Sequence, residues 1–363
     1  VSTSFHSPRL AVDNSGRAVV ALTDTYLTGY SYDPTTNWQL EALPQAVEVL
    51  AEIEMTGDPT SGETIVIWRA PGSSSLDAWS SRFDPGLGWQ DTGLVETADD
   101  SVGKLHLAQS ANGGAIAVLP QPATGNRFIA DIVSYHLQGA NWVGPTVVDD
   151  IDTESASYPR IDINANGDGA AVWQQETPVT SGIALPSVYI SFYDSATEQW
   201  SDAELVEDEV DFSAVRPDVA VDADGNVFVI WLQDSPDYST RDLHANRYDA
   251  AAQDWSGPRL LELDDTAASF AAIDSHQVVA DDLGNSIVVW TQDDGVQRNI
   301  RSARYSAADV DCLPTELLEE IDTGDANIPE LVIDRSSGDA MVVWHQNNGS
   351  TAVIDIWANR YVN

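Results

Sequence analysis

Positive charge is scarce in this sequence. Its 363 residues contain 16 Lys and Arg, with Lys104 as the only lysine, against 58 Asp and Glu, so the formal net charge is −42. A field of this sign repels phosphate backbones and anionic lipid headgroups. We therefore expect no nucleic-acid partner and no attraction to an anionic membrane surface.

Cysteine and long apolar runs are also rare. Cys312 is the single cysteine, which excludes an internal disulfide framework and a cysteine-based zinc site. No run reaches the roughly 18 apolar residues that a membrane span needs, so we expect no membrane insertion. The chain does not open with a basic segment followed by an apolar one, so we expect that a secretion signal was removed or never existed.

Apolar residues are nevertheless abundant enough to build a core. Hydrophobic residues make up 43% of the chain, which includes 12 Trp, and only 20% of residues are charged. A disordered polyanion has few aromatic residues and a high density of charge. The acidity is therefore expected to be a property of the surface of a folded protein.

One sequence pattern recurs along the chain and predicts a β-hairpin. In its clearest copy, residues 217–233, alternating apolar residues lead to an Asp-x-x-Gly turn, and a second apolar run ends in Trp-x-Gln. Seven copies align on one residue of the second strand, and these anchors lie 46 to 59 residues apart. The anchors are Leu22, Trp68, Leu119, Trp173, Trp231, Trp290 and Trp344.

A second landmark follows each hairpin and completes the repeat. A third strand ends in a residue such as Tyr248, and a Trp such as Trp255 then precedes a fourth strand. Cys312 occupies this Trp position in one copy, so we expect it to be a buried structural thiol. Four strands repeated seven times predict an all-β protein, a seven-bladed β-propeller of four-stranded antiparallel blades, with residues 1–363 as a single domain.

The hairpin Pro-x-h-x-h-Asp-x-x-Gly-Asn-h-x-h (h is apolar) at residues 217–229 resembles the NHL-type propeller repeat. The longer unit, with Trp-x-Gln and a later Ala-Asn-Arg-Tyr, is similar to repeats of secreted or surface proteins of bacteria. This resemblance implies a secreted, periplasmic or cell-surface location. It implies no shared catalytic motif.

The ends of the chain leave one blade a strand short. Seven hairpins and seven third strands are followed by only six fourth strands, because the chain stops soon after Tyr361. Three interpretations stay open. Residues 1–5 close the last blade, or that blade has three strands; the sequence is a segment of a longer chain; or a partner donates the missing strand.

Side chains that depart from the repeat are the candidates for a functional site. By propeller topology, the ends of the Trp-x-Gln strands and the residues around each proline share one end of the blades. Histidine and arginine at this end could act as a base and as a cation that neutralises a uronate carboxylate, or the histidines could bind a metal. The candidates are His6, His276, His345, Arg69, Arg160 and Arg216.

Two further features carry weaker expectations. The turn that contains Asp222 and Asp224 has closely spaced carboxylates that suit calcium, although a tight Asp-Gly turn explains the same residues, and no cofactor is required. Acidic loop residues, among them Glu207 and Asp208, are expected to form a solvated rim. Such a rim favours a protein or a neutral glycan as partner over an anionic polysaccharide.

The sequence therefore favours a secreted or surface-exposed, non-catalytic propeller that serves as a binding or structural module. One alternative is a polysaccharide lyase or hydrolase that uses a His/Arg site at the channel mouth. A lectin is the second alternative.

Overall fold

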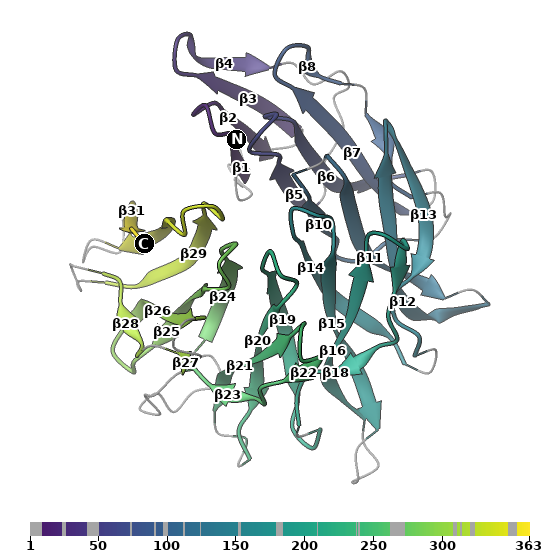
Figure 1. Ribbon diagram of the computed structural model, residues 1–363, viewed down its shortest axis with the longest axis vertical. Helices are drawn as coiled ribbons and strands as arrows, with labels where there is room; N and C mark the ends of the chain where they lie inside the picture. Colours follow the sequence, from purple (N-terminus) through teal and green to yellow (C-terminus); the bar gives the residue numbers. More distant parts are fainter. Residues whose placement is uncertain are drawn as a thin grey trace. The chain divides into compact units, whose positions relative to one another are not determined.

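The computed structural model shows an all-β chain built from repeated antiparallel sheets (Figure 1). It describes residues 9–23, 27–41, 51–72, 75–90, 92–96, 101–111, 113–123, 125–151, 154–178, 184–208, 210–236, 238, 240–261, 273–307, 311–312, 314–319, 324–347 and 354–363. The fold is a seven-bladed β-propeller, as the repeat predicts. No helix in the described residues is long and apolar enough to cross a membrane.

The first three sheets follow the chain order, and we number them blades 1 to 3. Blade 1 consists of β1 (Arg9–Val12), β2 (Ala18–Thr23), β3 (Leu27–Asp33) and β4 (Asn37–Glu41). Blade 2 consists of β5 (Ala51–Gly57), β6 (Thr64–Pro71), β7 (Leu76–Asp84), β8 (Gly88–Trp89) and β9 (Gly93–Leu94). Blade 3 consists of β10 (His106–Gln109), β11 (Ala115–Ala123), β12 (Asn126–Gln138) and β13 (Asn141–Val147).

The remaining four sheets are blades 4 to 7. Blade 4 consists of β14 (Ala156–Ile163), β15 (Gly169–Pro178), β16 (Ala184–Asp194), β17 (Gln199–Trp200) and β18 (Glu204–Leu205). Blade 5 consists of β19 (Ala214–Val221), β20 (Val227–Asp234), β21 (Arg241–Asp249), β22 (Asp254–Trp255) and β23 (Arg259–Leu260). Blade 6 consists of β24 (Ile273–Ala280), β25 (Ser286–Asp293), β26 (Arg298–Ser306), β27 (Asp311–Cys312) and β28 (Glu316–Leu317), and blade 7 of β29 (Ala326–Ile333), β30 (Ala340–Asn347) and β31 (Ile354–Tyr361).

The fourth strand of four blades is split into two short pieces that pair with the same third strand. In blade 5 both β22 and β23 pair with β21, and Ser256, Gly257 and Pro258 separate them. Proline has no N–H for the ladder and Gly257 has a φ of 89°, so the strand cannot run on without a break. Pairing therefore begins at Asp254 and includes Trp255, earlier than the sequence predicts.

The chain divides into two compact units, residues 1–171 with 191–203 and residues 172–190 with 204–363. Blades 1 to 3 belong to the first unit and blades 5 to 7 to the second, while the division runs through blade 4. In the described residues blade 7 has three strands. The predicted closure by residues 1–5 lies outside the described residues.

The Asp-x-x-Gly turns are held by their first side chain. In blade 5, Oδ1 of Asp222 accepts hydrogen bonds from the backbone N–H groups of Asp224 and Asn226, at 2.9 and 2.8 Å. Gly225 has a φ of 81°, which a residue without Cβ adopts without strain. The same position is occupied by Asp13 in blade 1, Asn164 in blade 4 and Asp281 in blade 6.

The Trp anchors are core residues. Trp173, Trp231 and Trp290 are fully buried, and Trp344 nearly so. In each of these four blades the indole N–H donates to the Gln two residues further along the strand, at 2.9 to 3.1 Å. A buried indole N–H needs such an acceptor, which explains why Trp and Gln recur together.

A buried carboxylate follows the fourth strand and binds the edge of the third strand. The backbone N–H of Val188 donates to both carboxylate oxygens of Glu207, which is 4% exposed. In blade 3 the N–H of Ile132 donates to Asp149 in the same way. The expectation that Glu207 belongs to a solvated rim is therefore wrong, because its carboxylate is needed to satisfy a buried backbone donor.

Candidate functional site

The first strands of three blades share an irregular start that exposes one side chain. The residue before the proline has a left-handed backbone, with φ of 54° at Tyr158, 53° at Arg216 and 55° at Ile328. In each case this residue is exposed and the following proline is buried. The pairing register of β19 and β29 shifts at this point.

The proline explains why the strand can begin with a bulge, but it does not explain the left-handed backbone of the residue before it. Proline cannot donate to the ladder, so a bulge at the start of a strand tolerates it. The residue before a proline prefers extended backbone, and a left-handed φ is an outlier for a β-branched residue such as Ile328. Strain of this kind at an exposed side chain makes each of these positions a candidate functional residue.

The bulge of blade 5 is held from both sides. The N–H of Arg216 donates to Oε1 of Gln174 at 3.0 Å, and its carbonyl oxygen lies 2.6 Å from Nε2 of His276. Because a carbonyl can only accept, Nε2 of His276 carries the proton and donates it. His276, which replaces the proline of blade 6, therefore positions the neighbouring bulge.

His345 lines a cavity in blades 6 and 7. The cavity has a volume of about 310 Å³ and is lined by Arg298, Asp325, Asn327, Ile328, His345, Gln346 and Asn347. Nη1 of Arg298 donates to Oδ1 of Asn327 at 3.0 Å. His345 is exposed and is paired with Asn327 across the strands. An imidazole, a guanidinium and amides around one cavity could bind a carboxylate or hydroxyl groups.

The two candidate arginines of the first unit donate hydrogen bonds to backbone carbonyl groups. Nη1 of Arg69 donates to the carbonyl of Val102 at 3.4 Å, and Nη1 of Arg160 donates to the carbonyl of Pro159 at 3.3 Å. Burial, and then the positive charge of Arg160, lower the pKa of His106 well below its usual value. The structure thus brings together His276 with Arg216, but places Arg69 and Arg160 in structural contacts. His6 lies outside the described residues.

The turn proposed for calcium uses its carboxylate internally. Asp222 accepts the turn N–H groups described above, and its Oδ2 accepts from the side-chain amide of Asn226 at 2.7 Å. Within the described residues no group of three or more His, Cys, Asp and Glu could hold a metal ion. Calcium binding at Asp222 and Asp224 stays a prediction.

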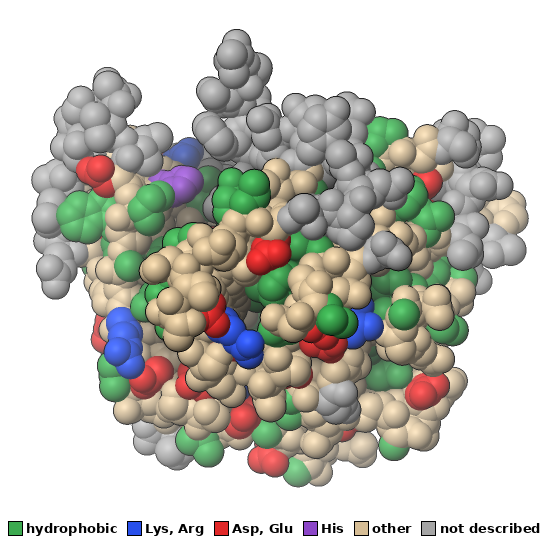
Figure 2. Space-filling view, turned by 90° about the horizontal axis from the view of Figure 1, so that it is seen from above, with side chains coloured by type: hydrophobic (Ala, Val, Ile, Leu, Met, Phe, Trp, Pro, Cys, Tyr) green, Lys and Arg blue, Asp and Glu red, His purple; other side chains and the backbone are tan. Residues whose placement is uncertain are grey.

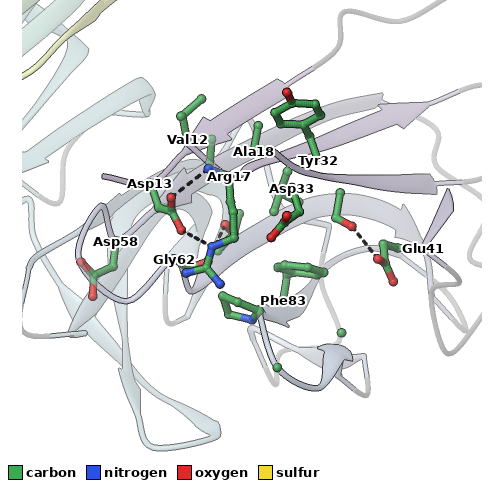
Figure 3. Close-up of a pocket in the computed structure, with 18 of the residues that line it drawn as sticks. Val12, Asp13, Arg17, Ala18, Tyr32, Asp33, Glu41, Asp58, Gly62 and Phe83 are labelled. Carbon is green, nitrogen blue, oxygen red and sulfur yellow. Dashed lines mark hydrogen bonds and ion pairs between the residues drawn. The ribbon is translucent and has the colours of Figure 1, made fainter. Parts of the chain in front are cut away.

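A second cavity, which the sequence did not reveal, lies in blades 1 and 2 (Figure 3). It has a volume of about 310 Å³, and on its lining Nε of Arg17 donates to Oδ2 of Asp13 at 2.8 Å. Hydrogen bonds from Ser15 and Arg17 outweigh the opposing effect of burial and lower the pKa of Asp13. Asp33 and Glu41 point into the same space, so the cavity is acidic.

Acidic side chains are scattered over the face seen in Figure 2. Several lie beside Lys or Arg side chains, and none of the visible acidic groups merges into one continuous patch. This view shows the acidity as a distributed surface property.

The sequence pointed to Arg216, His276 and His345 because they interrupt or adjoin the repeat. It missed Tyr158 and Ile328, although both stand directly before a proline, because the left-handed backbone that exposes them cannot be read from an Xaa-Pro pair. It missed Arg298 because this residue lies on a third strand, where no departure from the repeat marks it.

The fold is a β-propeller in which the first strands of three blades begin with an exposed residue in a left-handed conformation. No protein-family model matches the chain, and no curated protein matches it. The NHL-like resemblance is therefore supported only as far as the propeller fold.

Solved structures match over 84 to 99% of the chain at low identity. An ulvan lyase from a polysaccharide lyase family has a TM-score of 0.62 at 10% identity, over 97% of this chain and 90% of that one. The β-propeller domain of the trilobed protease from Pyrococcus furiosus, described as having an open velcro topology, has a TM-score of 0.53 at 10% identity, over 99% and 96%. An α-L-arabinofuranosidase from Fusarium graminearum has a TM-score of 0.51 at 11% identity, over 84% and 94%. At such identities the likeness shows the fold alone.

Proposed function

We propose that this protein is a secreted or surface-exposed, non-catalytic binding module that recognises a protein partner through the bulged starts of its first strands. The observation that carries the proposal is the repeated left-handed residue before proline, which exposes a different side chain in each of three blades: Tyr158, Arg216 and Ile328.

The chemistry of these side chains suits a protein surface. Tyrosine and arginine are enriched among residues that dominate the energy of protein interfaces. The three blades share the same backbone conformation at this position, but each exposes a different side chain. In a repeat protein such positions can contact a partner while the recurring residues maintain the fold. The net charge of −42 favours a neutral or basic partner over a polyanion.

Photo-crosslinking tests this proposal. A photoreactive amino acid is placed singly at positions 158, 216 and 328, and at the control position 283, where the native Leu283 is 67% exposed on an Asp-x-x-Gly turn. We expect the same partner protein to be crosslinked from the three bulge positions and not from 283. Crosslinks from 283 alone, or none at all, would contradict the proposal, as would glycan-array binding that Tyr158→Ala abolishes.

A second candidate function is eliminative cleavage of a uronate polysaccharide at the cavity of blades 6 and 7. It is favoured by the exposed imidazole of His345 and the guanidinium of Arg298 on one cavity. His345 would remove the proton next to the carboxylate, and Arg298 would neutralise that carboxylate. The electron pair of the broken C–H bond would form the new C=C bond and expel the glycosidic oxygen, which takes a proton from water. Incubation with uronate polysaccharides would release products that absorb in the ultraviolet, and His345→Ala would remove this activity without unfolding the protein.

A further inference from the structure

The third strands of blades 5 and 7 share a four-residue sequence but differ in how much of it is buried. Ala-Asn-Arg-Tyr stands at residues 245–248, near the end of β21, and at residues 358–361, at the end of β31. Ala245 and Asn246 are each 3% exposed, whereas Ala358 and Asn359 are exposed. In the described residues β21 has strand neighbours on both sides, while β31 pairs with β30 alone.

Blade 7 is otherwise docked as blade 5 is. The side-chain amide of Asn246 donates to the carbonyl of Val206 in blade 4 at 2.9 Å, and that of Asn359 donates to the carbonyl of Leu318 in blade 6 at 3.1 Å. The guanidinium of Arg304 lies 4.6 Å from the ring centre of Tyr361. Blade 7 thus contacts blade 6 as blade 5 contacts blade 4. The difference lies in the edge of β31 that faces away from β30.

In blades 1 to 5 a tryptophan pairs with a residue near the end of the third strand, and in blade 6 Cys312 takes its place. Tyr193 pairs with Trp200 across the strands, and their ring centres are 5.1 Å apart. Tyr248 and Trp255 pair in the same way, with ring centres 5.4 Å apart. Tyr361 is the equivalent residue of blade 7.

A carboxylate seven residues after that tryptophan covers the start of the third strand. Glu207 follows Trp200 at this spacing and accepts the N–H of Val188, whose carbonyl accepts the N–H of Val206 at 3.0 Å. Asp149 follows Trp142 and accepts the N–H of Ile132. In blade 6, Glu319 follows Cys312 at the same spacing and accepts the N–H of Ile300.

The matching N–H in blade 7 belongs to Ile356. Val188 precedes Tyr193 by five residues, and Ile356 precedes Tyr361 by five. The side chain of Ile356 is 68% exposed. The edge of β31 therefore presents one aromatic ring and one backbone N–H at the spacing that a fourth strand of this protein would satisfy.

We propose that β31 is a docking edge for an extended segment of another polypeptide, which carries an aromatic residue and, seven residues later, a carboxylate. The segment pairs antiparallel with β31, its aromatic ring packs on Tyr361, and its carboxylate accepts the N–H of Ile356. Residues 1–363 hold no copy of this pair outside the blades. Among Tyr and Phe only Tyr26 has a carboxylate at this spacing, and that residue, Asp33, already belongs to β3. Every Trp followed by a carboxylate at this spacing belongs to the fourth strand of blades 2 to 5, at residues 89, 142, 200 and 255.

A peptide of residues 196–208, which copies the fourth strand of blade 4, is the probe. We expect saturable binding to the intact protein, a higher Tm, and slower hydrogen exchange at Ile356 and its neighbours in β31. Trp200→Ala, which removes the ring, or Glu207→Ala, which removes the acceptor, should each weaken binding of the peptide at least about tenfold, which corresponds to about 1.4 kcal/mol.

Variants of the protein separate edge pairing from other contacts. Ile356→Pro removes the N–H and should abolish peptide binding, while Tyr361→Ala, which leaves the backbone intact, should weaken it. Near-native circular dichroism and Tm of each variant are the requirement for reading these results. Equal binding of the substituted peptides, or unchanged binding by folded Ile356→Pro, would overturn the proposal.

Two further outcomes also decide the question. No binding to the intact protein would contradict docking. Binding that appears only after deletion of residues 1–8 would mean that the chain's own N-terminal segment occupies the edge of β31. This result would contradict the proposal that the docked segment comes from another polypeptide. The inference is independent of the proposed recognition surface, because the crosslinking positions 158, 216 and 328 do not lie on β31.

Discussion

The indole N–H of Trp231 donates to Oε1 of Gln233, two residues further along β20, at 3.0 Å, with both side chains buried. In blade 3, where Leu119 replaces the Trp, the hydroxyl of Tyr135 donates to Oε1 of Gln121 at 3.1 Å instead. The buried glutamine therefore receives a hydrogen bond even when its usual donor is missing. The same hydrogen bond to the glutamine thus recurs in two blades with different donors. This recurrence indicates that the glutamine oxygen stabilises the blade.

Gln233→Ala is expected to lower the free energy of unfolding by about 1 to 3 kcal/mol, because it leaves a buried indole N–H without an acceptor. Urea unfolding measures the change. In a Trp231→Phe background, which has no indole N–H, the same substitution should have a smaller effect, and equal losses in both backgrounds would show that the hydrogen bond contributes nothing.

Glu207 should make stability depend on pH near neutrality. Burial raises the pKa of Glu207 from 4.5 to about 7, so the folded state favours the protonated form. The contribution of protonated Glu207 to the free energy of unfolding is fully present below pH 4.5 and is lost as the pH rises through 7. The shift corresponds to about 3 kcal/mol.

Glu207→Gln removes this titration while keeping an oxygen for the N–H of Val188. The variant should be more stable than the wild type above pH 7, with a smaller difference near pH 5. Urea unfolding at several pH values gives both curves, and Asp202→Asn, at an exposed position just before β18, is the control. A pH profile that is the same for wild type and Glu207→Gln would contradict the assignment.

The fold was predictable because its determinants are periodic in the sequence. The recurrence of Trp231 and Gln233 at equivalent positions reflects a core that each blade builds in the same way, so one copy predicts the others. The fourth strands were less predictable, because the break at Gly257 and Pro258 divides a strand without changing its partner. The resulting pieces are too short to carry a periodic signal.

The candidate site was only partly predictable, because it depends on contacts between blades. The sequence marked His276 as a departure from the repeat, but its role as a donor to the Arg216 carbonyl requires the position of the neighbouring blade. Glu207 lies in an acidic run that looks solvated. Its spacing from Trp200 was the signal that it belongs to the strand edge.

The strain at Ile328 should be measurable. Asparagine tolerates a left-handed backbone better than a β-branched residue, so Ile328→Asn should raise the free energy of unfolding by about 1 kcal/mol. Thermal unfolding measures it as a higher Tm. Val332→Asn, on the same strand and 60% exposed, has no left-handed backbone and should bring no gain. A lower Tm for Ile328→Asn than for the control would show that the isoleucine is retained for stability.

Gly29 should be essential for the packing of blade 2 on blade 1. A Cβ at Gly29 would lie 2.3 Å from Nε1 of Trp89, whereas Gly93 on β9 has nothing within 4 Å. At the position equivalent to Gly29, Ser80 accepts from the indole of Trp142 at 2.8 Å, so the glycine is specific to this blade pair.

Gly29→Ala is expected to destabilise the fold by about 1 to 3 kcal/mol, because overpacking forces the buried indole to move. Gly93→Ala is the matched control, since it adds the same methyl group to a β-strand where there is space. Thermal unfolding of both variants should show a clear loss of Tm for Gly29→Ala and little change for Gly93→Ala. Equal Tm values would mean that the ring of Trp89 shifts without cost, and that blades 1 and 2 are packed more loosely than this contact indicates.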